Sequence, residues 1–165
     1  MALKPDREIL NGGTDISYFC NQVNEKGSVV VLSAGGSGAA MDDAAALVIR
    51  PSTVYASGQY PIGLLLCDVV SGDLTKTHLN QHKDEVQVGS KVTLLQRGKV
   101  VTNVISGTVT AGYGAYASAT ASGALCALLD NNGLLTATPG TIKRLGTWLS
   151  NKDADGFAKV SINLV

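Results

Sequence analysis

Short runs of aliphatic and β-branched residues, each ending at a glycine-rich or asparagine-rich turn, constrain the fold of this chain most. Residues 29–32 and 63–70 are two such runs, and their length and composition are typical of buried strands. Residues 41–49 are ambiguous, because the alanines favour a helix and the run before Arg50-Pro51 favours a strand. The succession of short runs predicts an all-β fold, an antiparallel β-sandwich or small barrel with few helical residues.

Turn residues between closely spaced strands predict hairpins in the second half of the chain. Residues 92–95 and 100–104 flank Gln96-Arg97-Gly98-Lys99, in which glycine suits a turn that requires positive φ. Another turn is expected at Asn132-Gly133, and a further hairpin across residues 151–156. The core is expected to draw on aliphatic side chains from all of these strands: Val31, Leu65, Val92, Leu94, Val101, Leu145 and Val160.

Length and composition fit one domain, or one domain with an arm. Of the 165 residues, 45% are apolar and only 5% are aromatic, so the core must consist largely of Val, Leu, Ile and Ala. Trp148, the single tryptophan, is expected in that core. The 13 basic and 13 acidic residues give a formal net charge of zero, so neither nucleic acid nor an acidic membrane is an expected partner.

Targeting and redox features are those expected of a soluble intracellular protein. Charged residues stand where a signal peptide has its apolar stretch. The longest apolar run, residues 62–67, is far shorter than the roughly twenty residues that a membrane helix needs. Cys20, Cys67 and Cys126 are odd in number and lack a CxxC spacing, which favours buried free thiols over disulfides or a zinc site.

A glycine-rich segment after the first buried run imitates a nucleotide-binding loop or a nucleophile elbow. The imitation is incomplete, because Met41 stands at the third glycine position of GxGxxG after Gly36 and Gly38. Ala39 likewise replaces the last glycine of GxSxG around Ser37. We therefore expect an ordinary turn at the end of a strand.

Two segments resemble metal sites. His78 and His82 would share a helix face, where Asp84 or Glu85 could join them on zinc. No further ligand is evident, and a solvated loop or an interface loop is favoured. The segment Asn151-x-Asp153-x-Asp155 matches the start of an EF-hand loop, yet isoleucine stands at its twelfth position instead of glutamate, so a turn is favoured. We expect no metal, no organic cofactor and no enzymatic activity.

We expect residues 1–26 to form an extended N-terminal arm and residues 27–165 to form the β-rich body. The opening residues are polar and irregular, with turn signals at Pro5 and Asn11-Gly12-Gly13. An apolar segment interrupts them and is expected to anchor the base of the arm on the body, through Ile16, Tyr18 and Phe19.

Three stretches of the chain resemble the head-decoration, or capsid cement, proteins of tailed bacteriophages such as cyanophages. They are MALKPDREILNGGTDISYFCNQVNEKGSVVVLS, VGSKVTLLQRGKVVTN and GTWLSNKDADGFAKVSINLV. The resemblance implies a structural virion protein with a β-tulip-like body, often a homotrimer, that bridges adjacent major capsid protein subunits. It implies a location on the outer surface of the capsid, and in the host cytoplasm during assembly. The arm would reach over the major capsid protein, with contacts from Leu3, Lys4, Arg7, Ile9, Leu10 and Asn11.

Two other classes of function remain open at this point. A tail-associated or fibre-associated virion β-domain would differ in its oligomer symmetry and its location in the virion. A small hydrolase or carbohydrate-binding β-sandwich would show a polar pocket with convergent acidic side chains.

Overall fold

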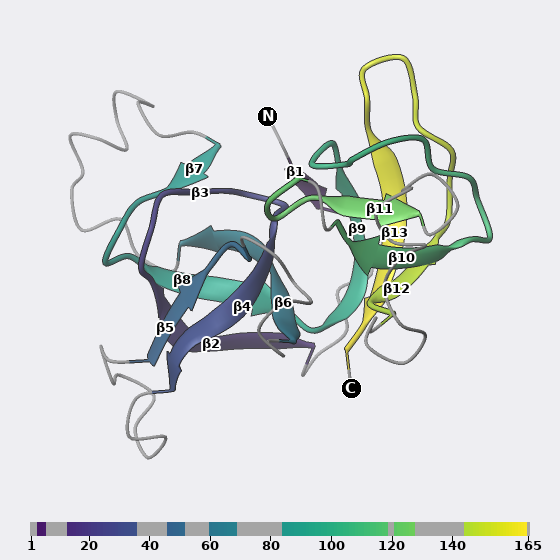
Figure 1. Ribbon diagram of the computed structural model, residues 1–165. Coiled ribbons are helices and arrows are strands. Elements are labelled where there is room, and N and C mark those ends of the chain that lie inside the picture. Colours follow the sequence, from purple (N-terminus) through teal and green to yellow (C-terminus); the bar gives the residue numbers. More distant parts are fainter. Residues whose placement is uncertain are drawn as a thin grey trace.

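The computed structural model describes residues 3–5, 13–35, 46–51, 60–68, 84–118, 121–127 and 144–164. Every regular element within these ranges is a β-strand, which confirms the all-β prediction (Figure 1). The strands are β1 (Leu3–Pro5), β2 (Thr14–Cys20), β3 (Asn24–Glu25), β4 (Val29–Gly35), β5 (Ala46–Ile49), β6 (Pro61–Asp68), β7 (Glu85–Val86), β8 (Lys91–Leu95), β9 (Arg97–Thr102), β10 (Gly114–Ala117), β11 (Leu125–Ala127), β12 (Gly146–Trp148) and β13 (Ala158–Asn163).

Five strands close into a barrel in the order β2-β5-β4-β6-β8, and β8 pairs back onto β2. β2 and β5 are parallel, whereas the other neighbours in the barrel are antiparallel. The ambiguous segment at residues 41–49 therefore ends in a strand, β5. The barrel interior is filled by aliphatic side chains and one thiol: Cys20, Val30, Val48, Leu65, Val86, Val92 and Leu94.

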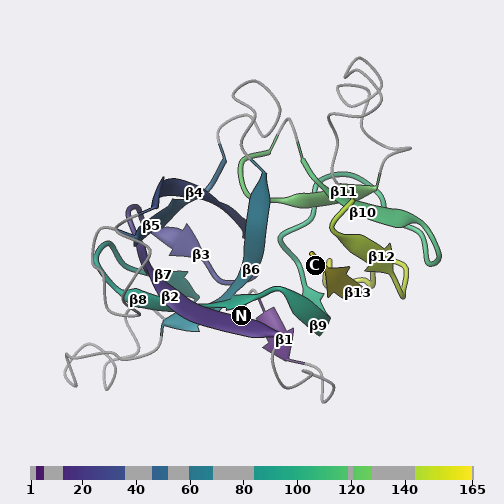
Figure 2. The same cartoon turned by 90° about the horizontal axis from the view of Figure 1, so that it is seen from below.

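Six strands form a sheet beside the barrel, in the order β1-β9-β13-β12-β10-β11 (Figure 2). All of its neighbours are antiparallel. The predicted hairpin across residues 151–156 is confirmed, since β12 and β13 pair with Thr147 opposite Ser161. The hairpin is held locally, because Asp153 Oδ1 accepts the backbone N–H groups of Asp155 at 3.1 Å and Phe157 at 2.7 Å.

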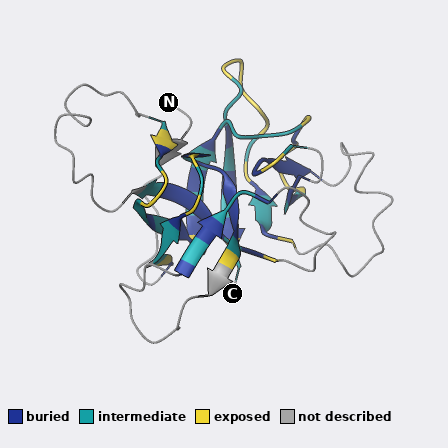
Figure 3. Ribbon diagram, turned by 60° about the vertical axis from the view of Figure 1, so that its left-hand side comes forward, coloured by how far each residue is buried: buried dark blue, intermediate teal, exposed yellow. Residues whose placement is uncertain are grey.

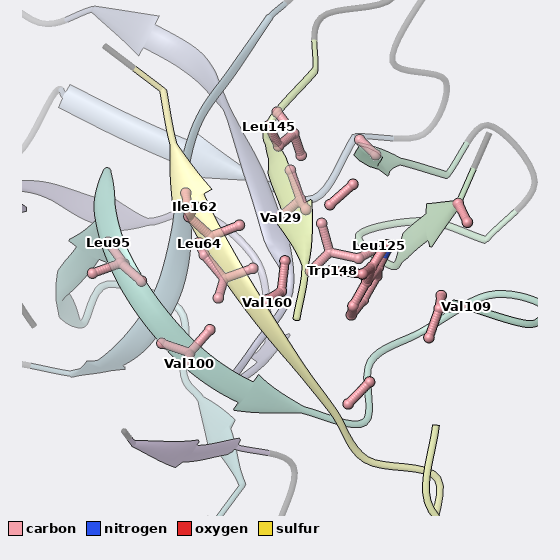
Figure 4. Packing of buried hydrophobic residues seen from close by; sticks show 14 of the residues in the cluster. Val29, Leu64, Leu95, Val100, Val109, Leu125, Leu145, Trp148, Val160 and Ile162 are labelled. Carbon is pink, nitrogen blue, oxygen red and sulfur yellow. The ribbon is translucent and has the colours of Figure 1, made fainter. Parts of the chain in front are cut away.

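One apolar cluster joins the barrel to the sheet (Figure 4). Successive residues of a strand point to opposite faces, so Leu65 enters the barrel while Leu64 and Leu66 face the sheet. Burial on both faces explains why β4 and β6 contain unbroken runs of apolar residues and do not alternate between apolar and polar residues. The barrel contributes Val29, Leu64, Leu66 and Leu95, and the sheet contributes, among others, Val100, Leu125, Trp148, Val160 and Ile162.

The predicted core is buried at six of its seven positions. Val101 is the exception, because burial alternates along β9 and Val101 lies on the face away from Val100 and the shared cluster. Figure 3 shows that buried residues run along the strands and that exposed residues gather in the connecting loops. The six positions at most 2% exposed are Val31, Leu65, Val92, Leu94, Leu145 and Val160.

The predicted hairpin around Gln96-Arg97-Gly98-Lys99 is wrong. β8 and β9 do not pair with each other, and instead form one bent strand that leaves the barrel and enters the sheet. The bend lies at Gln96, whose N–H donates to Gly13 O at 2.7 Å, and Arg97 N donates to the same oxygen at 3.0 Å. Leu164 N donates to Gln96 O at 2.9 Å. Partners distant in sequence therefore replace the local turn, and Gly98 lies within β9 opposite Ile162.

Candidate interaction surface

The barrel begins earlier in the chain than residue 26, the expected boundary between the arm and the body. Residues 14–20 form β2, which pairs with β8 through Thr14 opposite Leu95 and with β5 through Cys20 opposite Val48. Cys20 is fully buried in the barrel core. The polar residues Thr14, Asp15 and Ser17 make this strand difficult to predict from the sequence, although its aromatic residues favour β-structure.

The expected anchor residues lie in the barrel wall. Tyr18 packs against the barrel core, and Ile16 and Phe19 are partly buried. Burial, together with the nearby negative charge of Asp15, raises the pKa of the Tyr18 phenol. The Lys91 Nζ atom lies 5.9 Å from the centre of the Phe19 ring, a cation–π arrangement across the β2–β8 pair.

The first residues of the expected arm form the edge strand of the sheet. β1 pairs with β9 at three positions, Leu3 with Thr102, Lys4 with Val101 and Pro5 with Val100. An edge position suits Pro5, which has no N–H to donate to a ladder. Two residues expected to contact a capsid, Leu3 and Lys4, thus lie on the sheet of their own chain. The other four, Arg7, Ile9, Leu10 and Asn11, lie outside the described residues.

β1 and β2 are both partners of the same bent strand. Figure 2 shows β2 along β8 and β1 beside β9, where that strand enters the sheet. Between these two ladders, Gly13 O accepts the two N–H groups at the bend. The N-terminal segment therefore fastens the joint between barrel and sheet. In the sequence, Gly12-Gly13 indicates only a turn, because the partners that reveal its role at the joint are more than eighty residues away.

A second surface is built by two loops at one end of the sheet. Tyr113 and Leu149 are large side chains that are 43% and 42% exposed there. The loops are tied together, because Ala111 N donates to Asn151 Oδ1 at 2.9 Å and Lys152 Nζ donates to Gly107 O at 3.1 Å. These bonds hold a mixed apolar and polar surface in a defined shape.

A buried polar cluster supports the end of β2. Asn24 Nδ2 donates to the Cys20 Sγ atom at 2.8 Å, and this sulfur donates to Gln22 O at 3.0 Å. Burial raises the pKa of the Cys20 thiol, although the hydrogen bonds and the charge of Arg50 act in the opposite direction. A neutral, hydrogen-bonded thiol at this position stabilises the turn that leads from β2 to β3.

The cysteines, the tryptophan, the possible metal ligands and two turns are the sequence features that remain. All three cysteines are free, Cys20 and Cys126 buried and Cys67 partly so, and Trp148 is fully buried as predicted. No group of three metal-ligating side chains occurs in the part of the chain that the structure describes. His78 and His82 lie outside that part, as do the glycine-rich segment after Gly35 and the turn at Asn132-Gly133.

No protein-family model and no curated protein sequence matches this chain. Among the described residues, no helix has the length and apolar character required to cross a membrane.

Proposed function

We propose that the protein decorates the expanded head of a tailed bacteriophage and stabilises it by bridging adjacent major capsid protein subunits. The three segments that resemble capsid cement proteins support this proposal. On the structural side, it is carried by a short N-terminal strand at the edge of the sheet, ahead of a body in which barrel and sheet share one core. The protein would act on the outer surface of the virion as a homotrimer, and be present in the host cytoplasm during assembly.

The bent strand β8–β9 is suited to a bridging protein that carries mechanical tension. A head filled with DNA pushes its subunits apart, so a bridging protein must transmit tension through its own body. β8 is paired on both sides, with β2 and β6, and β9 is paired on both sides, with β13 and β1. Pulling the barrel away from the sheet would break these ladders and the shared apolar cluster together.

The N-terminal segment is the proposed contact with the shell. Arg7, Ile9, Leu10 and Asn11 carry both charge and apolar groups, which are suited to a protein surface. The backbone of Leu3 and Lys4 is paired with β9 in the free protein, so backbone pairing of these residues with the shell would require β1 to leave β9. An extended segment of this kind can add a strand to the edge of a capsid sheet.

The test is binding of the purified protein to expanded, DNA-filled heads and to unexpanded proheads. We expect binding to the expanded heads alone. A variant that lacks residues 2–10 keeps Gly13 at the bend and should fold, yet bind heads far more weakly. A matched control, Val88→Ser, changes an exposed apolar side chain outside both the N-terminal segment and the loop surface, and should bind like the wild type. Full occupancy by the truncated protein would refute the role of the segment, and absence of binding by the intact protein would refute decoration itself.

A further inference from the structure

The pairing of β1 with β9 is a short ladder at the edge of the sheet. It spans three residues, and Pro5 supplies no N–H, so few hydrogen bonds oppose the entropy that the chain regains when β1 detaches. β1 is the last strand on its side of the sheet. Its departure would leave β9 as an edge strand, which is a template for pairing with another extended chain.

The connection from β1 to β2 is longer than its own path requires. Pro5 lies opposite Val100 and Thr14 lies opposite Leu95, so nine residue steps along the N-terminal segment correspond to five steps along the bent strand β8–β9. Five strand residues span about 17 Å, whereas nine residues can reach about 30 Å when fully extended. The sequence therefore has enough length for β1 to reach the β9 edge of a second molecule that lies beside the first.

We propose that the β9 edge is an exchange site that accepts residues 3–5 of a second copy of this chain. The exchanged strand would make the same three pairs, Leu3 with Thr102, Lys4 with Val101 and Pro5 with Val100. Because each pair lost within one molecule is regained between two, exchange costs no contacts and depends on the local concentration of neighbours. Reciprocal exchange closes a dimer, and head-to-tail exchange closes a ring when the rotation between successive copies closes.

The test uses disulfide trapping at the paired positions 4 and 101. Directly opposed residues of an antiparallel ladder have Cα atoms about 4.5–5.5 Å apart, within the range that a disulfide spans. Lys4→Cys chains are mixed with Val101→Cys chains that carry a size tag, at protein concentrations up to about 1 mM. At this concentration β1 of a second molecule can compete for β9 with β1 of the same molecule. The mixture is oxidised and analysed on a non-reducing gel, with the unchanged chain alongside to account for its own cysteines.

We expect a mixed disulfide dimer that is several-fold more abundant than with Lys159→Cys chains in place of Val101→Cys. Lys159 pairs with Val101 from β13, on the side of β9 away from β1, and so controls for random collision. The double variant Lys4→Cys/Val101→Cys should form covalent dimers or closed rings, whose size gives the number of copies. An internal disulfide alone at every concentration would overturn exchange, and so would the absence of any disulfide. No capsid is present, so this result stands apart from the test of decoration.

Discussion

At the scale of single residues, the tightest constraint is the contact of β12 with β13. A Cβ atom on Gly146 would overlap the backbone oxygen of Ser161. Glycine is therefore required there by the closeness of two backbones and not by its φ angle. Gly112 is a different case, because its φ of 89° favours glycine while no atom lies within 4 Å of the position that a Cβ atom would take.

These two glycines give a matched prediction. Gly146→Ala should lower the free energy of unfolding by about 1–3 kcal/mol or more, since β12 and β13 must separate to admit the methyl group. Gly112→Asn should cost well under about 1 kcal/mol, because asparagine tolerates the left-handed region. Urea unfolding followed by fluorescence measures both values. Equal stability of Gly146→Ala and wild type would show that the strands are not packed this closely.

The thiol of Cys20 predicts a loss of stability in alkali. Burial raises its pKa in the folded state, so above the unfolded value of about 8.5 the unfolded chain loses a proton that the folded chain keeps. The contribution of the protonated Cys20 thiol to the free energy of unfolding is complete below that pH and is lost as the pH rises through the folded-state pKa. In urea unfolding between pH 7 and 10, Cys20→Ala should lose less stability than the wild type. Parallel curves for the two proteins would contradict the assigned pKa direction.

At the scale of elements, the sequence predicts the structures that depend on neighbouring residues. It does not predict the structures that depend on residues far away in the sequence. The β12–β13 hairpin could be recognised because Asp153 and Gly156 form its turn within the same segment. The bend at Gln96 could not, because its partners Gly13 and Leu164 lie far away in the sequence. The same limit applies to β2, whose polar residues indicate an arm until its pairing with β8 is known.

The bend itself can be tested at Gln96. Gln96→Pro removes the N–H that donates to the carbonyl of Gly13, and we expect a cost of about 1 kcal/mol or more. Gln96→Ala keeps that N–H and loses only a side-chain bond to Asp15, 3.4 Å long, so its cost should stay below about 0.5 kcal/mol. Thermal unfolding by circular dichroism compares the two. Equal stability of Gln96→Pro and Gln96→Ala would contradict the bent strand.

At the scale of the whole molecule, barrel and sheet should unfold as one unit, because they share a core. Trp148 reports on the sheet, since it is the single tryptophan and is fully buried there. Leu65→Ala empties a site inside the barrel and should cost about 2–5 kcal/mol. We expect the Trp148 fluorescence transition to shift with the circular dichroism transition. Leu149→Ala, at an exposed position, should shift neither, and an unmoved Trp148 transition in Leu65→Ala would mean that the two parts unfold separately.

Decoration is proposed to strengthen an expanded head, and the release of packaged DNA on heating reports on that strength. Heads that lack the protein are heated alone, with the intact protein, or with the variant that lacks residues 2–10, and the temperature of DNA release is recorded. We expect a higher release temperature with the intact protein and little change with the truncated variant. An unchanged release temperature with the intact protein, whether or not it binds the heads, would contradict the proposed role.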